Sequence, residues 1–558
     1  MQINNIRRFQ AISIYLLSIS ILLLILIEIT LSLTPPIARD ALIHHLAIPK
    51  LWLMNGSFYE IKWADFSYYP MNIDLLYLIP LYLNNDIIPN FIHMCFGIGT
   101  AYLIYNYLSN RFSRTAGLLG ILIFLSTPII VRMSTAAYVD LGLVFFTTAS
   151  LFAFIRWRDN QYKGYKWFFL SAIAMGLALG TKYNALIAWF FMTFVFVFAY
   201  SKDTGKQWTA IKYGAIFFII SLMIFSPWLI KNMMLTGNPL YPLFKGFFNS
   251  SNNINYEEST ISLVSGNSYM GIFKMREILY GENFWQTLLI PFRFFFQGQD
   301  SSDRYFDGVL NPILLIMIPF AFINNKFSFD KFLLLSFSFF FILMTFLLDQ
   351  MRIRYILPAI PPLVILTILG ITNVWQWAAT KSNLLKNILR TGVLCIIILM
   401  IGKNIIYINH YFQNIQPLNY ILGKESKDDF ISRHDGSYAA INYINKNTSE
   451  KAKIRLVMLA GRGYYLNRSY VDDPSFGMNV IDGLVKNSKD DKLFQDYLNS
   501  LGCTHMLIRM DMFHQFLQNN YSPDTTNRLF QQMKNTMNTV YNSNGYSVME
   551  IASFSSRN

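Results

Sequence analysis

The chain has little charge and little cysteine for its length. Only 14% of its 558 residues are charged, against about 25% in a typical soluble domain. A soluble chain of this size would fold as several domains with polar surfaces, which this composition cannot supply. Three cysteines are too few for a disulfide-rich secreted module, and 53% hydrophobic residues exclude a disordered chain.

Long apolar runs are what the sequence has instead. About 20 apolar residues cross the roughly 30 Å of hydrocarbon in a bilayer. Candidate runs lie near 11–33, 88–108, 116–131, 137–156, 166–181, 184–200, 210–230, 308–323, 331–348, 355–378 and 388–408. We therefore predict a polytopic α-helical membrane protein with about eleven spans.

The net charge of +14 belongs mostly to the apolar part of the chain. Residues 1–409 carry 30 basic and 18 acidic side chains, while residues 410–558 carry 16 and 14. A nucleic-acid-binding surface would gather basic residues on a soluble face. Here they are scattered between apolar runs, so no nucleic-acid partner is expected.

The basic residues instead predict an orientation. With a cytoplasmic N-terminus, the inner segments hold sixteen of them: Arg7, Arg8, Arg111, Arg114, Arg156, Arg158, Lys163, Lys166, Lys202, Lys206, Lys212, Lys326, Lys331, Lys381, Lys386 and Arg390. Cytoplasmic loops are enriched in Lys and Arg. This orientation puts loops 34–87 and 231–307 and the tail outside.

We predict two units, a transmembrane domain at residues 1–409 and an extracytoplasmic domain at 410–558. In the tail, apolar runs at 454–459, 504–509 and 546–551 predict strands, and segments near 437–446, 490–500 and 524–535 predict helices. This alternation is typical of a small α/β domain. The first apolar run is too long for the core of a cleaved signal peptide. Two cysteines lie in spans and one in the tail, so no disulfide is expected within an exported part.

The first outer loop has the pattern of interfacial helices. After Pro35-Pro36, apolar residues recur at helical spacing, interrupted by Arg39, Asp40, His44, His45 and Lys50. This pattern predicts an amphipathic helix in the membrane interface. A second such segment follows Tyr69-Pro70, and residues 284–297 form a third candidate.

Two carboxylates are expected at the outer boundary. Asp40 follows the first span, where a carboxylate is costly unless it is paired or functional. It could equally be the N-cap of the interfacial helix, and the two roles are compatible. Asp140 opens the fourth span and has the same alternative. Together with His44 or His45 the two could hold a divalent metal, although neighbouring helical residues point apart and only one histidine could face the site.

Four basic residues remain in the short outer turns: Arg132, Lys182, Arg352 and Arg354. They could extend to lipid headgroups, or they could bind a phosphate, for which arginine offers a planar fork and lysine a point charge. The segment GNPLYP (237–242) contains one glycine and two prolines, and it predicts a rigid turn that shapes a pocket.

These residues fall within a familiar pattern. The chain resembles the C-type integral-membrane glycosyltransferases, the group with protein O-mannosyltransferases and lipid A aminoarabinose transferases. The matching stretches are RDALIHHLAIPKLWLMNG with SYYPMNIDLLY (39–77), AAYVDLGLVFF (136–146), MGLALGTKYNAL (175–186), SPWLIKNMMLTGNPLYPLF (226–244) and RIRYILPAIPPL (352–363). They are spread over about the first two-thirds of the chain, and THMLIR after Leu501-Gly502 is similar to the tail of bacterial members.

The resemblance implies a polyprenyl-phosphate sugar donor and a first-loop acid that acts on the acceptor nucleophile, a position that Asp40 matches. Two departures leave the acceptor and the metal open. Ala41 follows Asp40 where O-mannosyltransferases often have Asp-Glu, and Tyr-Pro-Met-Asn replaces the Lys-Pro-Pro run of aminoarabinose transferases.

The predicted function is therefore sugar transfer to a lipid, glycan or protein acceptor outside a bacterial plasma membrane, with Asp40 as general base. The predicted substrate-binding residues are His44, His45, Tyr69, Asp140, Lys182, Arg352 and Arg354, with Asp40 and Asp140 as metal candidates. The alternatives are a transporter or flippase of lipid-linked sugars, which would place charge in mid-span, and a scaffold whose tail binds a partner.

Overall fold

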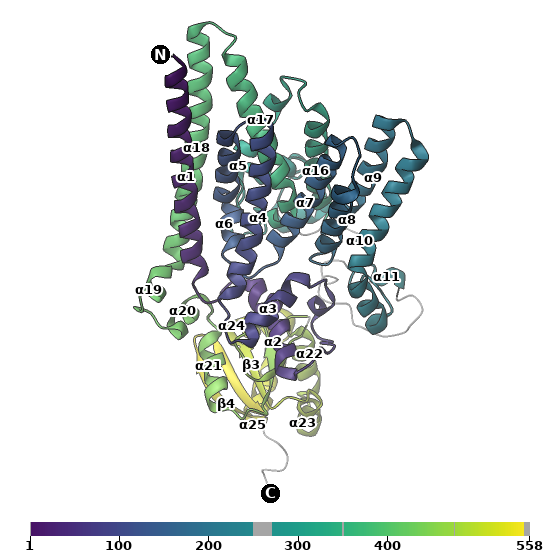
Figure 1. Ribbon diagram of the computed structural model, residues 1–558. Helices are drawn as coiled ribbons and strands as arrows, with labels where there is room; N and C mark the ends of the chain where they lie inside the picture. The colour runs from purple at the N-terminus through teal and green to yellow at the C-terminus, as the bar shows by residue number, and fades with distance from the viewer. Residues whose placement is uncertain (1, 249–270, 349–350, 474, 552–558) are drawn as a thin grey trace.

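The computed structural model describes residues 2–248, 271–348, 351–473 and 475–551. Part of the predicted outer loop 231–307 lies outside these ranges. The helices form an upright bundle with the N-terminus at one end and a small sheet domain at the other, as Figure 1 shows. The sheet domain shares a hydrophobic cluster with the first predicted outer loop. This end of the bundle is called the outer end below, after the predicted orientation.

Seven helices among the described residues are long and apolar enough to cross a membrane. They are α1 (Gln2–Ser32), α7 (Asp140–Asp159), α9 (Ala185–Thr204), α10 (Gln207–Thr236), α16 (Ser328–Phe346), the segment Ile353–Ala378 formed by η5 and α17, and α18 (Asn383–Ile415). Helices α5 (Arg114–Ser126) and α6 (Pro128–Ser134) add an eighth if their 70° bend lies within one span.

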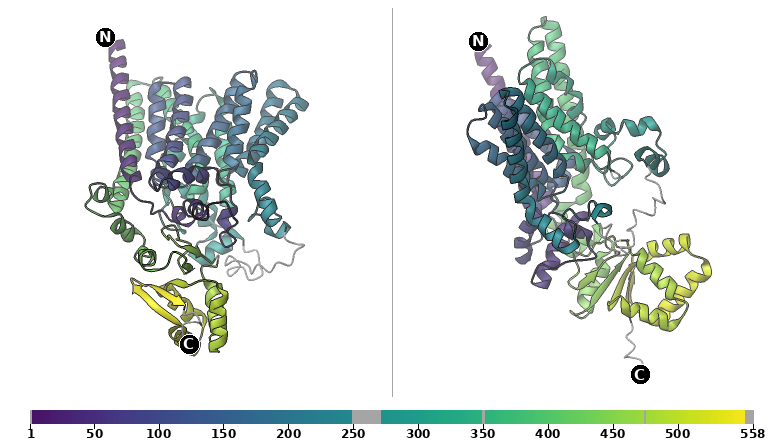
Figure 2. Two further views of the ribbon diagram at one scale, coloured as in Figure 1. Left: turned by 60° about the horizontal axis from the view of Figure 1, so that its bottom comes forward. Right: turned by 90° about the vertical axis from the view of Figure 1, so that its right-hand side faces the viewer.

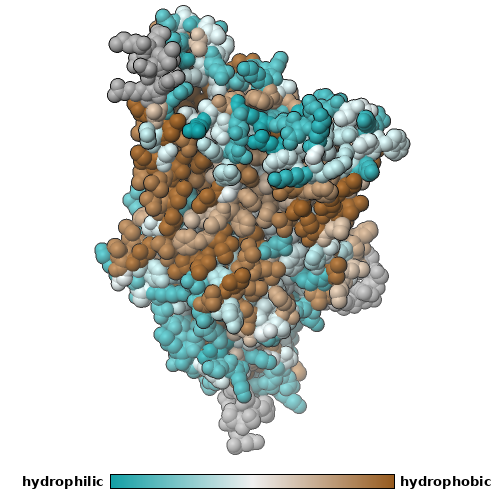
Figure 3. Space-filling view, viewed as in Figure 1, coloured by the Kyte–Doolittle hydropathy of each residue, from teal (hydrophilic) through white to brown (hydrophobic). Residues whose placement is uncertain are grey.

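The other predicted spans are also helical. They correspond to α4 (Ile88–Arg111), α8 (Tyr165–Leu179) and the short pair α15 (Ile313–Ile316) and η4 (Pro319–Phe322). By length and apolar composition alone, seven or eight of the predicted spans qualify as membrane-crossing helices. Helix α8 and the short pair are shorter than the rest, and polar residues interrupt α4. An apolar band crosses the face of the bundle that Figure 3 shows, as expected of an integral membrane protein.

The bundle core lies around α7 and α17 (Ile360–Ala378). Some 78% of the apolar window of α7 and 89% of the span containing α17 is buried, against 17% for α1 and α18. Close packing depends on small residues at crossings. A Cβ on Gly176 of α8 would lie 2.6 Å from the Ile224 side chain and 2.9 Å from the Ser221 carbonyl oxygen of α10. These contacts hold the helices that lead to the outer end.

Helices form in the first outer loop as predicted, but the first does not lie against lipid. A π-helical turn, η1 (Ala41–His45), leads into α2 (Ala47–Asn55), which ends at Gly56 with φ +71°. Its residues Ile48, Leu51 and Trp52 are buried in a core shared with the sheet domain. This corrects the predicted membrane-interface position of α2. By contrast, α3 (Asn72–Tyr82) exposes Leu76, Ile79 and Tyr82, as an interfacial helix would.

The remaining outer segments are short helices. They are η2 (Asp65–Tyr68), α11 (Lys245–Phe248), α12 (Ile272–Tyr280), α13 (Phe284–Leu288) and α14 (Ile290–Phe296). The predicted interfacial helix at 284–297 is therefore divided between α13 and α14, with the second helix beginning at Ile290-Pro291. Arg293 of α14 pairs with the buried Glu282 at 2.9 Å, which ties this loop together.

The C-terminal domain is the predicted α/β unit. Its sheet has the order β2-β1-β3-β5-β4, with β1 parallel to β2 and β3 and with β5 antiparallel to β3 and β4. The strands are β1 (Lys453–Val457), β2 (Ser469–Val471), β3 (His505–Arg509), β4 (Met537–Ser543) and β5 (Tyr546–Ile551). The helices are α19 (Pro417–Ile421), α20 (Lys427–His434), α21 (Tyr438–Asn447), α22 (Met478–Asn487), α23 (Asp491–Ser500), α24 (Met510–Asn520) and α25 (Pro523–Thr536).

The three predicted strands and three predicted helices of the tail are present, whereas β2 and β4 were not predicted. Figure 2 shows the sheet and its helices as one body below the bundle. The predicted boundary at 409/410 falls inside α18, which continues to Ile415.

Candidate active site

The predicted acidic and basic residues meet at the outer end because each lies where a helix begins or ends. Asp40 stands between α1 and η1, and Asp140 is the first residue of α7. Lys182 follows α8, and Arg352 and Arg354 lie at the start of η5 (Ile353–Ala359). Chain reversals at one end of the bundle therefore gather residues that are far apart in sequence.

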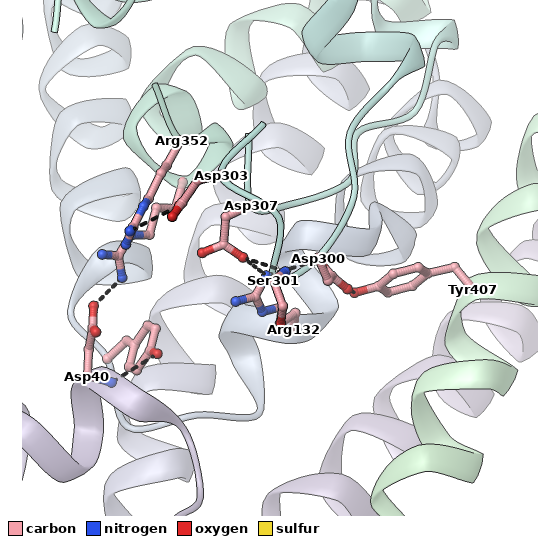
Figure 4. Close-up of polar contacts among 10 residues, drawn as sticks. Asp40, Arg132, Asp300, Ser301, Asp303, Asp307, Arg352 and Tyr407 are labelled. Atoms are coloured by element: carbon pink, nitrogen blue, oxygen red, sulfur yellow. Dashed lines mark hydrogen bonds and ion pairs between the residues drawn. The ribbon is translucent and has the colours of Figure 1, made fainter. Parts of the chain in front are cut away.

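Asp40 is paired with Arg354. The Arg354 guanidinium donates a short, charge-assisted hydrogen bond to the Asp40 carboxylate (Figure 4), and the two side chains are only 12% and 16% exposed. Asp40 occupies the N-cap position of η1 but makes no side-chain capping bond, so its carboxylate serves the ion pair. Burial favours the neutral acid and would raise the pKa of Asp40, but the charge and hydrogen bond of Arg354, together with the two neighbouring histidines, hold it well below its usual range.

Asp140 and Lys182 form a second ion pair beside the first. Lys182 Nζ lies 2.7 Å from Asp140 Oδ1, and the Asp140 side chain is 1% exposed. The second oxygen of Asp140 has no hydrogen-bond partner in the part of the chain that the structure describes. Lys182 and Arg354 both lie over the ring of Tyr355, at 5.6 and 5.4 Å from its centroid. The two pairs thus flank one aromatic ring.

The two histidines take different roles. His45 Nδ1 lies 2.7 Å from Asp74 Oδ1, and His44 stacks on Phe66 with ring centroids 4.3 Å apart. Burial lowers the pKa of both histidines to about 3 and raises the pKa of Asp74 to about 7. Both shifts favour a pair that shares one proton and carries no net charge. The charges of Asp40, Lys182 and Asp140 also act on His45, so this pair lies near the two ion pairs.

Tyr69 belongs to an aromatic wall at the edge of this cluster. Its ring lies 5.4 Å from those of Phe66 and Tyr183 in edge-on contacts. The Tyr183 hydroxyl donates to the Tyr241 carbonyl at 2.9 Å, and Asn232 donates to the Tyr183 hydroxyl at 3.1 Å. Tyr241 belongs to the segment GNPLYP, whose Gly237 ends α10 at φ +71°. The predicted turn therefore supports the wall that carries Tyr69.

The other two outer arginines are also paired with acids. Arg352 Nη2 lies 3.2 Å from Asp303 Oδ1, a carboxylate that is 64% exposed. Arg132 binds Asp300 and Asp307 at 2.9 and 2.8 Å. Figure 4 shows Arg352 above Asp40, and Arg132 lies apart in a row with Asp300 and Tyr407. Arg132 therefore fixes the 300–307 loop to α6, whereas Arg354 binds Asp40 and Arg352 binds Asp303.

A cavity of about 220 Å³ lies on another side of the Asp40 loop. Ala38, Arg39, Thr135, Tyr138 and Tyr411 are among its lining residues, and the three cations beside Asp40 and Asp140 are not. The Tyr138 hydroxyl accepts a hydrogen bond from the Asp40 N–H at 3.3 Å, so a residue that lines the cavity is bonded to the backbone of Asp40. Its wall contains Asn90, which is 2% exposed and whose side-chain oxygen has no partner among the described residues.

The predicted metal candidates do not come together as a metal centre. Within the described ranges, no group of three or more His, Cys, Asp or Glu side chains could hold a metal ion. Asp40 and Asp140 are each bound by a cation, which a metal would have to displace. The two carboxylates are therefore treated as partners of these cations and not as metal ligands.

Sequence reasoning missed four residues of this region: Glu28, Asp74, Tyr138 and Tyr355. A signal existed for two of them, because Asp74 is a carboxylate within an apolar helix and Glu28 a carboxylate within the first span. Glu28 is 1% exposed and lies one helical turn before the end of α1. Tyr138 and Tyr355 adjoin predicted site residues but have no distinguishing pattern.

Comparisons with known proteins give a family match for part of the chain. Residues 53–236 match the family model of dolichyl-phosphate-mannose-protein mannosyltransferases, a region that includes Asp140 and Lys182. No curated protein matches the chain in sequence.

Solved structures share the whole architecture. ArnT from Cupriavidus metallidurans in the apo state is 13% identical, with 95% of this chain and 97% of that chain covered and a TM-score of 0.57. ArnT bound to undecaprenyl phosphate is 12% identical, covering 96% and 98% with a TM-score of 0.55. The archaeal oligosaccharyltransferase AglB from Archaeoglobus fulgidus, in complex with an inhibitory peptide and a dolichol-phosphate, is 12% identical, covering 89% and 70% with a TM-score of 0.52. The chain has the fold of these membrane glycosyltransferases, and its residues 53–236 match the model of the mannosyltransferase family.

Proposed function

We propose that this chain is a membrane glycosyltransferase that moves a sugar from a polyprenyl-phosphate donor to an acceptor at the outer membrane boundary. The observation that carries the proposal is the buried Asp40–Arg354 pair beside the Asp140–Lys182 pair. A carboxylate surrounded by cations at the edge of an apolar bundle fits both needs of the reaction, a base for the acceptor and charge for the leaving phosphate. The shared fold and the family match support it.

The donor phosphate is the natural competitor for Arg354. Arginine binds phosphate oxygens through a planar fork, and the present partner of Arg354 is a carboxylate. When the phosphate binds Arg354, together with Lys182 and Arg352, it takes Arg354 away from Asp40. The carboxylate of Asp40 then becomes more basic at the moment when the donor is in position.

The reaction follows from that exchange. The acceptor hydroxyl or amine loses its proton to Asp40 as its oxygen or nitrogen forms a bond to the anomeric carbon of the sugar. The bond between that carbon and the phosphate oxygen breaks, and the electron pair leaves with the polyprenyl phosphate. Lys182, Arg352 and Arg354 stabilise the charge that develops on the departing phosphate, most strongly where water is excluded.

The acceptor is proposed to approach through the 220 Å³ cavity. That cavity touches the loop of Asp40 through Ala38 and Tyr138 but not the three phosphate-binding cations. Donor and acceptor would therefore reach Asp40 from different sides. Exposed Arg39, together with Thr135 and Tyr411, gives the cavity hydrogen-bonding groups for a polar acceptor.

We assign the protein to a bacterial plasma membrane, with the active site and the C-terminal domain outside. The sixteen basic residues of the predicted inner segments support this orientation. The fold shared with ArnT from Cupriavidus metallidurans, which extends over 95% of this chain, supports placement in a membrane.

The test is sugar transfer by the purified protein in proteoliposomes, with a polyprenyl-phosphate sugar and extracts of cell-envelope lipids, glycans and proteins as acceptors. The wild type is expected to move label from the donor into an acceptor, and Asp40→Asn is expected to abolish this without loss of expression. Movement of the intact donor across acceptor-free vesicles, without transfer in any extract, would instead support a flippase. Full transfer by Asp40→Asn would contradict the base assignment.

A further inference from the structure

The C-terminal domain holds the loop of Asp40 on both sides of this residue. The Tyr465 hydroxyl donates to the carbonyl of Pro36 at 2.6 Å, before Asp40 in the chain. The Tyr464 N–H donates to the carbonyl of Leu42 at 3.3 Å, after it. Residues 461–467, called the docking segment here, thus span the stretch of backbone that carries the proposed base.

Lys50 fastens the docking segment to α2. Its ammonium group donates to the carbonyls of Tyr464 and Leu466 at 2.7 and 3.0 Å and to the side-chain oxygen of Asn467 at 2.9 Å. An ammonium group has three donors, so all are used, and all three acceptors are uncharged. Burial lowers the pKa of Lys50 to about 8. Burying a cation without a bonded carboxylate costs free energy. We therefore expect the three hydrogen bonds of Lys50 to serve a role.

The packing around Lys50 makes α2 and the sheet domain one body. Ile48, Leu51 and Trp52 of α2 share a hydrophobic cluster with Ile454 and Leu456 of β1. Helix α2 follows η1 after a single residue, and η1 begins immediately after Asp40. A shift of α2 relative to the sheet therefore moves Asp40 relative to Arg354, which belongs to the bundle.

The close approach of Gly461 shows how little clearance the docking segment has. Gly461 has φ +78°, and a Cβ there would lie 3.1 Å from the side chain of Ile43 in η1. Ile43 lies in η1, three residues after Asp40. Besides its hydrogen bonds to Pro36 and Leu42, the docking segment therefore makes a third contact with the Asp40 loop, at the residue after Leu42.

We propose that Lys50 is a positioning residue, which fixes the docking segment on α2 and thereby sets the position of Asp40 for sugar transfer. The C-terminal domain is on this account a structural part of the active site. The inference rests on the proposed function, because it assigns Asp40 the role of base. Lys50 itself touches neither substrate.

Two substitutions separate positioning from simple domain attachment. Lys50→Met keeps the length of the side chain and removes the donors, while Lys50→Arg keeps a charge and several donors. The matched control is Lys427→Met, which removes a cross-domain cation that pairs with Asp86 at 2.8 Å and makes no hydrogen bond to the docking segment within the described residues. All variants are compared as full-length protein in proteoliposomes, with expression and thermal unfolding as controls.

Lys50→Met is expected to lower kcat about 10- to 100-fold, because displacement of a catalytic group by about 1 Å has an effect of that size. Donor KM is expected to stay within about twofold, since the phosphate-binding cations are untouched. Lys50→Arg should recover much of kcat, and Lys427→Met should retain it. An unchanged kcat in Lys50→Met, an equal loss in Lys427→Met, or a rise in acceptor KM alone would overturn the proposal.

A second measurement does not depend on activity. Hydrogen exchange of the amides in residues 37–46 should become faster in Lys50→Met but not in Lys427→Met. If the wild type transfers no sugar, the proposed function fails, but the exchange result still decides whether Lys50 orders the loop. Unchanged exchange in Lys50→Met would overturn only the positioning role of Lys50. Should Lys50→Met fail to fold, Tyr465→Phe removes only the hydroxyl that binds Pro36 and is expected to shift exchange and kcat in the same direction.

Discussion

The carboxylate of Asp40 is ion-paired with the guanidinium of Arg354, and 314 residues separate the two in the chain. The pair has opposing consequences for a base. It holds Asp40 ionised and ready to accept a proton, yet it makes Asp40 a weak base by lowering its pKa. A donor phosphate that binds Arg354 relieves this weakness, so binding of the donor and activation of the base are coupled.

The first prediction concerns donor binding in Asp40→Asn. The substitution removes the carboxylate that competes with phosphate for Arg354, so undecaprenyl phosphate should bind this variant more tightly than it binds the wild type, although transfer is lost by at least about 100-fold. Binding is measured by titration in detergent with thermal unfolding as readout. Asp65→Asn is the control, because Asp65 lies in the same outer loop and pairs with Lys245. Weaker phosphate binding in Asp40→Asn would contradict the exchange.

The second prediction concerns pH. With Arg354 present, the pKa of Asp40 is depressed, so its ionised form persists well into acid and the stability from the pair is lost only as pH falls through that low pKa. Arg354→Gln removes the cation but leaves the burial, so the pKa of Asp40 should rise above the ordinary value of about 3.9. The acidic limb of kcat/KM should therefore move to higher pH in Arg354→Gln. Arg354→Lys, which keeps the charge, should leave the limb near its wild-type position.

The third prediction separates the outer arginines. Arg352 is held by the exposed Asp303 and can exchange its partner, whereas Arg132 is held by Asp300 and Asp307 together. Arg352→Gln should raise the donor KM with little change in the melting temperature. Arg132→Gln should lower the melting temperature and leave donor KM unchanged in the protein that remains folded. A raised donor KM in Arg132→Gln would show that Arg132 also binds the phosphate.

The positions of the bundle helices and of three tail strands were predictable from local patterns in the sequence. The apolar runs fixed where the bundle helices lie, because burial of apolar area depends on composition over about 20 residues. The tail strands at 454–459, 504–509 and 546–551 were likewise predictable from short apolar runs. Strand β4 was missed, although Asn544-Gly545 between β4 and β5 is a hairpin signal, with both residues at positive φ.

Pairings between distant residues were not predictable in the same way. The sequence indicated Asp40, Asp140, Lys182 and Arg354 as unusual residues at the outer end, but not that each acid is bound by one of the cations. Likewise, the apolar face of α2 predicts that this face is buried, but not whether it is buried against lipid or against protein. Lipid and the face of a protein sheet make the same demand on Ile48, Leu51 and Trp52, so the docking of α2 on the C-terminal domain depends on the tertiary fold.

The last prediction tests the Asp140–Lys182 pair as a unit. Asp140 is 1% exposed and its pair with Lys182 is largely buried, and removal of one partner leaves an uncompensated buried charge that costs about 3–5 kcal/mol. Asp140→Asn or Lys182→Met alone should therefore lower the melting temperature strongly. The double variant should be more stable than the sum of the two losses predicts, because no charge remains unpaired.

Donor KM should not recover together with the melting temperature in the double variant. Lys182 is proposed to bind the donor phosphate as well as Asp140, so the double variant should regain folding but not donor affinity. Thermal unfolding and donor KM are measured on the same four proteins. Recovery of both quantities in the double variant would make Lys182 only a structural partner of Asp140, and recovery of neither would mean that the two side chains are energetically independent.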